Sequence, residues 1–400
     1  MYFRNLLLLV PAAAAAKCGM AASDPQYQDF VANTTQHLPG WSTVDLDMPA
    51  VDRWTHIVTP VAKDMQNMIN TFKQLAGKVS QDIFALLELL SAKKVNELVD
   101  AMPKEYGDEI RGISKATGIK LAEVFFYNIA YEIEGACTSL VGQDAAGNLV
   151  HGRNLDFGLF FGWNTTEHQW RLTDALRPLL QNVRFIKGGE TVFNATVFAG
   201  YVGLLTGMKT GGFSITVNTR FDGTLWKGLR DWISGADRTG HFLSFLTRDS
   251  IMLDTTFDQA VERINSTKLL GPAYMIVGGV KPGEGAIVTR SHNESLHFVS
   301  LKDAQAAGKN YILQTNYDNW VKAPFFDDRR TPGQKCMEQV ISEQKVDFGG
   351  VFQVLSAIPT RNRLTTYSTL MSVHDGRMEA YYQHCPEAHC AVWMSEATLV

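Results

Sequence analysis

Residues 135–158 read Gly-Ala-Cys-Thr-Ser-Leu-Val-Gly-Gln-Asp-Ala-Ala-Gly-Asn-Leu-Val-His-Gly-Arg-Asn-Leu-Asp-Phe-Gly, and they mark the point where the chain changes from helical to strand-like patterns. Two short runs, Thr138–Gln143 and Leu149–Asn154, are rich in apolar and β-branched residues. The residues between them end in glycine, which is typical of a tight turn. The stretch therefore predicts a β-hairpin closed at Ala145-Ala146-Gly147.

The predicted hairpin brings three chemically useful side chains to one end of a sheet. Antiparallel pairing places Cys137 roughly opposite Asn154–Asp156, close to the guanidinium of Arg153 and the carboxylate of Asp156. A neighbouring arginine favours the thiolate, which is the reactive form of cysteine. Asp156 can hold that arginine or orient the nucleophile. The alternative interpretation is a buried structural cysteine beside an ordinary salt bridge.

The rest of the chain alternates strand-like and helical patterns. Further strand-like runs lie at 191–198, 213–218, 273–277, 286–289, 311–315 and 364–371, and helical patterns lie at 241–252, 257–264, 332–342 and 351–358. Residues 52–134 read as mostly helical, with apolar positions at Ile83–Leu90 and a last helix at Lys120–Glu132. Clustered strands with helices set apart indicate an α+β fold whose antiparallel sheets are covered by helices.

The first sixteen residues have the pattern of a secretory signal peptide. Arg4 precedes an apolar run from Leu6 to Ala16 that ends in three alanines. A permanent anchor is the alternative, but a membrane span needs roughly 20 apolar residues. Five Asn-x-Ser/Thr sequons agree with export and predict N-glycosylation at Asn33, Asn164, Asn194, Asn265 and Asn293.

Composition and charge limit the possible functions. Hydrophobic residues make up 45% and charged residues 20% of the 400 residues, which excludes a disordered chain. The formal net charge of −4 gives no support for nucleic-acid binding. Protonation of all ten histidines would change the sum to −4 + 10 = +6, so the protein would become positive in an acidic compartment.

The cysteines are the remaining chemical signal. In an oxidising compartment, five cysteines leave at least one thiol outside any disulfide, and such a thiol is a candidate for chemistry. The chain contains no Gly-x-Ser-x-Gly elbow, no His-Glu-x-x-His helix and no phosphate-binding loop ending in Gly-Lys-Ser/Thr.

Several collinear segments resemble the acid ceramidase and N-acylethanolamine acid amidase family of N-terminal-nucleophile hydrolases. They are Cys137–Val141, His151–Gly158, Phe198–Gly203, Gln314–Asp318 and Pro324–Pro332, within a match from about Gln36 to Cys390. The resemblance implies a four-layer αββα sandwich. It also implies a precursor that cuts itself between Ala136 and Cys137, giving a helical α-subunit (17–136) and a catalytic β-subunit (137–400).

The resemblance assigns the central role to Cys137, as the nucleophile that attacks an amide carbonyl. Once this residue is N-terminal, its own α-amine, with a reference pKa of about 7.7–8.0, can serve as the base. This would explain why the sequence shows no obvious His–Cys pair. No metal or organic cofactor is implied.

The resemblance also assigns roles to four polar residues. Arg153 and Asp156 would organise the thiol and the amine, Asn316 would donate to the oxyanion, and Arg329 would complete the polar network around Asp156. Without the resemblance, Asp327–Arg330 would be read as a solvated charge run and Asn316 as a turn residue. The chain departs from the family at Thr219, where relatives carry a glutamate. We still expect an active enzyme because the other positions match.

The cysteine pattern follows the acid ceramidase branch of the family. The resemblance implies a disulfide between Cys18 and Cys336, which would join the α- and β-subunits, and a second one between Cys385 and Cys390. A zinc site formed by His384, Cys385, His389 and Cys390 is the alternative at the C-terminus, but export favours the disulfide.

The resemblance implies hydrolysis of the amide bond of ceramide at a membrane surface in a lysosome, with secretion also possible. A saposin-type protein is the implied helper, and nucleic acid is not an expected partner. Two alternatives stay open: the same chemistry on acylethanolamines, and a secreted lipid-binding protein that keeps the fold without catalysis. A protease of other proteins gains little support.

Overall fold

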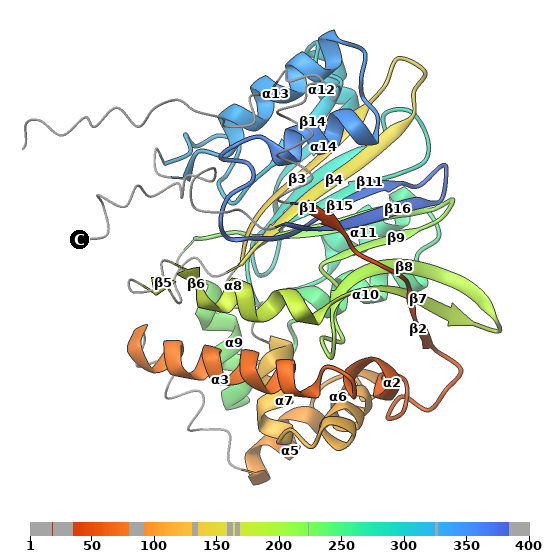
Figure 1. The fold of residues 1–400 in the computed structure, drawn as a ribbon. Coiled ribbons are helices and arrows are strands. Elements are labelled where there is room, and N and C mark those ends of the chain that lie inside the picture. Colours follow the sequence, from red (N-terminus) through yellow and green to blue (C-terminus); the bar gives the residue numbers. More distant parts are fainter. Residues whose placement is uncertain are drawn as a thin grey trace, which may run out of the picture.

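Two β-sheets lie face to face at the centre of the fold, and helices cover their outer faces (Figure 1). The computed structural model describes Cys18 and residues 35–79, 92–129, 135–157, 163–164, 169–222, 224–324 and 327–383. Strands β10 and β11 of one sheet pack on β3 and β4 of the other, α13 and α14 cover the first sheet, and α10 and α11 cover the second. The expected four-layer αββα sandwich is therefore confirmed.

The first sheet has the strand order β1-β16-β15-β4-β3-β14, and all its pairings are antiparallel. Its strands are β1 (Thr35–His37), β3 (Ala136–Gln143), β4 (Leu149–Asp156), β14 (Tyr311–Gln314), β15 (Thr365–Ser372) and β16 (Arg377–Gln383). The predicted hairpin is confirmed as β3 and β4, with Cys137 paired to Leu155. Its turn contains Gly147 at a φ of 93°, a conformation that a residue with a Cβ rarely adopts.

The second sheet has the order β13-β12-β11-β10-β9-β8-β7-β2, and its only parallel pair is β2 with β7. Its strands are β2 (Ser42–Asp45), β7 (Leu180–Lys187), β8 (Glu190–Phe198), β9 (Thr206–Lys209), β10 (Phe213–Thr219), β11 (Ala273–Gly278), β12 (Gly285–Arg290) and β13 (Ser295–Ser300). A separate small ribbon pairs β5 (Trp163–Asn164) with β6 (Gln169–Trp170). The strand-like runs predicted from the sequence all coincide with strands of these two sheets.

The helices before Cys137 form one group, and α8 and α9 lie beside them (Figure 1). The N-terminal helices are α2 (Thr55–Val58), α3 (Ala62–Val79), α5 (Ala92–Asp100), α6 (Lys104–Thr117) and α7 (Leu121–Ile129). The others are α8 (Arg171–Leu176) with a 3-10 turn (Arg177–Leu179), α9 (Leu225–Ser234), α10 (Leu243–Leu253), α11 (Phe257–Ser266), α12 (Leu301–Ala306), α13 (Arg330–Ser342) and α14 (Phe348–Ser356). The expected apolar helix at Ile83–Leu90 lies outside the described residues.

Helix α14 packs tightly against the strand that carries Arg153 and Asp156. Asp347 caps the N-terminus of this helix, because its carboxylate accepts a hydrogen bond from the backbone nitrogen of Gly350 at 2.8 Å. A Cβ atom at Gly152 of β4 would lie only 2.4 Å from the side chain of Val351. Because glycine allows this close approach, β4 is held directly under the helix.

The segment before Cys137 is more than a helical unit. It also supplies β1, which pairs with β16 in the first sheet, and β2, which pairs with β7 in the second. A buried ion pair adds to this attachment, because both terminal nitrogens of Arg248 on α10 contact the carboxylate of Glu109 on α6, at 2.6 and 2.7 Å. The residues on the two sides of the predicted cleavage point are therefore interlocked.

The disulfide expected between Cys18 and Cys336 is present. Residues 1–16, Asn33 and the expected pair Cys385–Cys390, with the alternative zinc ligands around it, lie outside the described residues. Of the other sequons, Asn293 is exposed in a turn, Asn265 lies at the end of α11, Asn194 lies in β8 and Asn164 in β5. Within the described ranges, no helix is long and apolar enough to cross a bilayer, and no three metal-binding side chains gather at one point.

Candidate active site

Cys137 is the second residue of β3 and is completely buried. Alternate residues of a strand point to the same face of the sheet, so Cys137 and Ser139 both face the second sheet. The Nη2 atom of Arg153 donates a hydrogen bond to the Cys137 Sγ atom at 3.1 Å. The proximity of thiol and guanidinium that the hairpin predicted is therefore confirmed.

The second sheet holds Arg153 in place. Its Nη1 atom donates to the backbone oxygen of Leu205 and, at 2.6 Å, to the hydroxyl of Thr206. The guanidinium also lies 5.6 Å from the ring centroid of Tyr367. These contacts aim one edge of a fully buried cation at the sulfur atom.

Asp156 binds Arg329 and not Arg153, the arginine three residues before it. Its carboxylate accepts hydrogen bonds from Thr365 Oγ1 at 2.6 Å, Asn362 Nδ2 at 3.0 Å and Arg329 Nη1 at 3.2 Å. Burial raises the pKa of Asp156, while Arg329 and the two other donors oppose this shift. Arg153 and Asp156 are an odd number of residues apart, so they face opposite sides of β4. Of the two roles suggested from the sequence, holding Arg153 is therefore wrong.

Arg329 connects this carboxylate to the nucleophile. Its Nη1 atom donates to the backbone oxygen of Cys137 at 2.8 Å, and its Nη2 atom donates to Asn316 Oδ1 at 2.8 Å. Two hydrogen bonds to the carboxylate of Asp327, at 2.7 and 3.0 Å, fix the guanidinium. Burial alone would lower the pKa of Arg329, but Asp327 and Asp156 hold it above its ordinary value. Arg329 is therefore a permanent buried cation.

Asn316 contacts the backbone on both sides of Ala136. Its Oδ1 atom accepts a hydrogen bond from the backbone nitrogen of Cys137 at 2.7 Å. Its Nδ2 atom donates to the backbone oxygens of Gly135, at 3.1 Å, and Thr219, at 2.8 Å. With the bond from Arg329, these contacts use both acceptor positions and both hydrogens of the amide. Asn316 is a fully engaged site residue, not an ordinary turn residue.

Thr219 lies at the end of β10, beside this amide. Its side chain is 2% exposed, and its hydroxyl has no hydrogen-bond partner among the described residues. A threonine here adds no charge beside Asn316, whereas the glutamate expected at this position from the family resemblance would add a carboxylate.

Reasoning from the residues alone missed several members of this network. Asp327 and Arg329 are 1% and 0% exposed, so the solvated interpretation of the charge run is wrong for both. Asn362 and Thr365 lie far along the chain from Asp156, and no local pattern connects them to it. In the run Asp327-Asp328-Arg329-Arg330 itself, no sequence pattern separates the two buried residues from their partly exposed neighbours.

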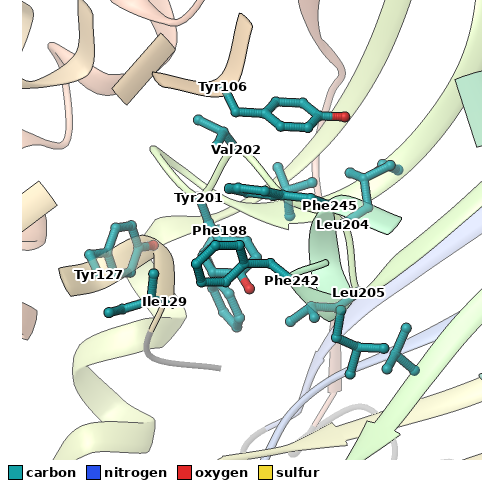
Figure 2. Close-up of a cluster of buried hydrophobic side chains, with 14 of the residues drawn as sticks. Tyr106, Tyr127, Ile129, Phe198, Tyr201, Val202, Leu204, Leu205, Phe242 and Phe245 are labelled. Carbon is teal, nitrogen blue, oxygen red and sulfur yellow. The ribbon is translucent and has the colours of Figure 1, made fainter. Parts of the chain in front are cut away.

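A small apolar pocket, with a cavity volume of about 30 Å³, lies close to this network. Its lining residues are Met68, Phe72, Tyr127, Phe157, Leu176, Phe198, Tyr201 and Leu205. Phe157 follows Asp156 directly, and the backbone oxygen of Leu205 binds Arg153. Figure 2 shows Tyr127, Phe198 and Tyr201 together within the surrounding cluster of buried hydrophobic side chains. The pocket provides an apolar surface next to polar groups.

The arrangement is suited to acyl transfer. A thiol accepts a hydrogen bond from a buried cation, in the same residue whose nitrogen and carbonyl oxygen are held by Asn316 and Arg329. The side-chain amide of Asn316 lies next to it, with its two hydrogens bound to the backbone oxygens of Gly135 and Thr219. These are the components of a cysteine nucleophile acting on a carbonyl carbon.

Two family models match the chain on either side of this nucleophile. The model for the β subunit of N-acylethanolamine-hydrolyzing acid amidase matches residues 39–93. The model for linear amide C–N hydrolases of the choloylglycine hydrolase family matches residues 137–335, so it begins at Cys137.

Individual proteins match over most of the chain. Human acid ceramidase is 39% identical over 407 aligned positions, which cover 98% of this chain and 99% of that protein. Mouse acid ceramidase is 36% identical, covering 95% and 97%. Among solved structures, an N-acylethanolamine-hydrolyzing acid amidase ortholog from Caenorhabditis elegans superposes with a TM-score of 0.49 at 29% identity, covering 59% of this chain and 93% of that one.

Proposed function

The chain belongs to the acid ceramidase family and is a linear amide C–N hydrolase, and on that premise we propose that it cleaves ceramide into sphingosine and a free fatty acid. The observation that carries the proposal is the convergence of three polar side chains on Cys137. Arg153 contacts its thiol, Asn316 its nitrogen and Arg329 its carbonyl oxygen.

The first step is cleavage of the chain by itself. The Cys137 sulfur attacks the carbonyl carbon of Ala136, and the C–N bond between the two residues breaks as the nitrogen takes up the thiol proton. The product is a thioester between Ala136 and the Cys137 sulfur, with a free α-amine on Cys137. Water then hydrolyses the thioester, which restores the thiol and leaves Ala136 as a C-terminal carboxylate.

The same groups then act on the substrate. The α-amine of Cys137 accepts the thiol proton, the sulfur attacks the amide carbonyl, and the proton passes to the departing sphingosine nitrogen. Water, deprotonated by the α-amine, hydrolyses the resulting thioester to the fatty acid. Arg153 supports the thiolate, while Asp156 acts through Arg329 to hold the backbone of Cys137.

Cleavage also changes what Asn316 can do. In the uncleaved chain, the two hydrogens of its amide are taken by Gly135 and Thr219. Departure of the new C-terminus would release the hydrogen held by Gly135. That hydrogen can then be donated to the oxyanion of the substrate, so the oxyanion site would be completed only by maturation.

The apolar lining of the pocket supports a substrate with a hydrocarbon chain, and the cavity of about 30 Å³ has to widen to admit it. It is lined by residues of α3, α7 and α8 together with residues 198–205. The lining residues therefore come from both sides of the proposed cleavage point in the sequence. We assign it to the acyl chain of the substrate, because burial of each methylene group contributes about 0.8 kcal/mol.

The substrate is insoluble, so the enzyme has to reach a lipid surface. Trp320 and Val321 are 54% and 48% exposed, on the loop that follows Asn316. The base of the loop is fixed, because Asp318 binds Arg220 at 2.7 Å. Tryptophan favours the membrane–water interface, and the next residue is the exposed Lys322. We propose that this loop tip contacts anionic membranes at acid pH.

The cleaved chains are proposed to stay together. The Cys18–Cys336 disulfide, strands β1 and β2, and the Glu109–Arg248 ion pair all cross the cleavage point. Denaturing electrophoresis without reductant is expected to show the two chains as one band. Two separate bands would rule out the covalent link.

We place the reaction in an acidic, lysosome-like compartment, with secretion as a second destination. The predicted signal peptide and the change to a positive formal charge on acidification support this placement. A saposin-type lipid-presenting protein is the proposed helper.

Rates on ceramide and on palmitoylethanolamide, measured side by side on the matured protein, test the substrate assignment. We expect ceramide to be hydrolysed faster. A strong preference for palmitoylethanolamide would mean that acylethanolamines, and not ceramide, are the substrate. Lipid binding without turnover of either compound would support a non-catalytic lipid-binding protein, the alternative motivated by Thr219.

A further inference from the structure

A chain of polar side chains crosses the layer between the two sheets, where apolar packing is usual. It starts at His151 of β4, whose Nε2 atom lies 3.0 Å from the hydroxyl of Thr216 on β10. Thr216 is 2.9 Å from the hydroxyl of Ser139 on β3, and Ser139 is 2.9 Å from Asn218 Oδ1 on β10. All four residues are 0–1% exposed. These hydrogen bonds do not involve the thiol of Cys137, although Ser139 is only two residues from Cys137.

The backbone at the end of the chain fixes the direction of each hydrogen bond. Asn218 Nδ2 lies 3.0 Å from the backbone oxygen of Gln314 and 3.2 Å from that of Thr315. Carbonyl oxygens only accept hydrogen bonds, so the nitrogen of the amide must face them and the oxygen must face Ser139. Ser139 therefore donates to Asn218, and Thr216 donates to Ser139.

The protonation state of His151 follows from the direction of these hydrogen bonds. Because the Thr216 hydrogen is used on Ser139, the Thr216 oxygen has to accept, and His151 Nε2 has to carry a hydrogen. The other ring nitrogen, Nδ1, lies 2.9 Å from the hydroxyl of Ser214, which also lies 3.2 Å from the backbone oxygen of Gly278. In a neutral ring with its hydrogen on Nε2, Nδ1 accepts, so the single hydrogen of the Ser214 hydroxyl is donated to Nδ1. Burial, together with Arg153, lowers the pKa of His151 to about 3, so the ring stays neutral in an acidic compartment.

Strand β10 holds Asn316 at two points. The side chain of Asn218 binds the carbonyl groups of the two residues directly before Asn316, and the backbone oxygen of the next residue, Thr219, binds the Asn316 side chain. The position of the Asn316 amide thus depends on the orientation of Asn218. That orientation is in turn stabilised by Ser139 and the residues behind it.

We propose that His151, Thr216 and Ser139 are positioning residues that, through Asn218, set the placement of Asn316 for self-cleavage and for turnover. The inference rests on the proposed function, because Asn316 has to act on the reacting groups for its placement to matter. The competing interpretation is a satisfied polar core that contributes only to stability.

Thr216→Val is the principal test, because it removes the hydroxyl while keeping the shape of the side chain. Thr196→Val is the matched control: Thr196 is also buried between the sheets, and its hydroxyl lies 3.3 Å from that of Thr369, away from Asn316. Thr216→Ser restores the hydroxyl and tests rescue. Self-cleavage rate, kcat and KM are measured for each, together with thermal stability.

We expect Thr216→Val to lower the self-cleavage rate and kcat by about tenfold or more, with KM within about twofold of wild type. Thr216→Ser should recover most of this loss, and Thr196→Val should retain wild-type rates at similar stability. Equal losses in the two valine variants, or wild-type kcat in Thr216→Val, would overturn the proposal.

Nitrogen-15 spectra of histidine-labelled wild-type protein provide a readout that does not require activity or a variant that folds. The His151 signal, assigned by its loss in His151→Gln, should show a neutral ring with hydrogen on Nε2. A hydrogen on Nδ1 instead would contradict the direction of the chain. If wild-type protein neither cuts itself nor hydrolyses any acyl amide, the proposed function fails, and this spectrum still reports on the hydrogen-bond chain.

Discussion

The side-chain oxygen of Asn316 accepts a hydrogen bond from the backbone nitrogen of Cys137 at 2.7 Å, and this nitrogen belongs to the peptide bond that we propose is cut. The nitrogen of the same side chain holds the carbonyl group of Gly135, on the other side of Ala136. The Asn316 amide therefore binds the backbone on both sides of Ala136, where it can act in the proposed cleavage of the chain and in the later hydrolysis of the substrate.

Asn316→Ala is expected to lower kcat by about 10²–10³, because loss of one oxyanion donor costs about 2.7–4 kcal/mol. It should also slow self-cleavage, because the Cys137 nitrogen and the Gly135 oxygen lose the side chain that holds them. A time course of precursor cleavage, followed by turnover per matured chain, measures both. Asn319→Ala, three residues further along and partly exposed, is the control and should keep wild-type rates. Wild-type rates in Asn316→Ala would remove this residue from the mechanism.

Glu109→Gln is expected to destabilise the fold by about 3–5 kcal/mol, because it leaves the buried cation of Arg248 without its counter-charge. Both side chains of this pair are fully buried. The exposed pair of Lys227 and Asp231 offers a comparison, and Asp231→Asn should cost about 0–1 kcal/mol. Urea denaturation of the uncut Cys137→Ala protein measures both variants. Similar small losses would mean that the ion pair does not hold the segments together.

Acidification is expected to destabilise the fold through His151. Its folded pKa is lowered to about 3 by burial and by Arg153, while the unfolded value is about 6.5. Between these pH values the unfolded chain binds a proton that the folded chain does not. The stability that neutral His151 contributes is therefore fully present above pH 6.5 and is lost as the pH falls toward 3. Between pH 7 and 4.5 the loss is about 2–3 kcal/mol.

His151→Gln should therefore flatten the dependence of the unfolding free energy on pH, while the exposed His374→Gln should not. Urea denaturation at pH 7 and 4.5 measures the difference. An unchanged pH dependence in His151→Gln would mean that His151 is protonated in the folded protein.

Trp320→Ser is expected to weaken binding to anionic vesicles at pH 4.5 and to lower hydrolysis of ceramide in those vesicles several-fold. Hydrolysis of a short-chain amide dissolved without vesicles should be unaffected, because the indole does not contact the described site. Trp41→Ser, a substitution of another partly exposed tryptophan, is the control. Equal loss on both substrates would place the effect of Trp320 at the site instead of the membrane.

The sequence predicts most of the fold because its signals are local. The turn at Ala145–Gly147 determines the register of β3 and β4, so the pairing of Cys137 with Leu155 follows from a short stretch of residues. Strands β1, β2, β7, β9, β13 and β16 of the two sheets were not predicted. Strands β1 and β2 are three and four residues long and lie at sheet edges, so their pairing depends on a partner that the local sequence does not reveal.

The candidate site was predictable only in part, for a physical reason. The approach of Arg153 to Cys137 follows from the hairpin, and the involvement of Asn316 and Arg329 was expected from the family resemblance. The pairing of Asp156 with Arg329 joins residues 173 positions apart, so only the resemblance predicted it. It removes one of the two roles that the residues alone suggested for Asp156, that of holding Arg153. Asp327 was missed because charge runs are usually solvated. Its partner Arg329 lies in the same run, but only the fold buries this pair beside Cys137 and Asn316.

Intact mass and N-terminal sequencing of purified precursor, before and after incubation at about pH 4.5, test the central claim most directly, with Cys137→Ala alongside. The account predicts a new chain that begins at Cys137 in the wild type and an intact Cys137→Ala protein. A wild-type chain that stays whole, or that is cut at another bond, would contradict self-activation at Cys137.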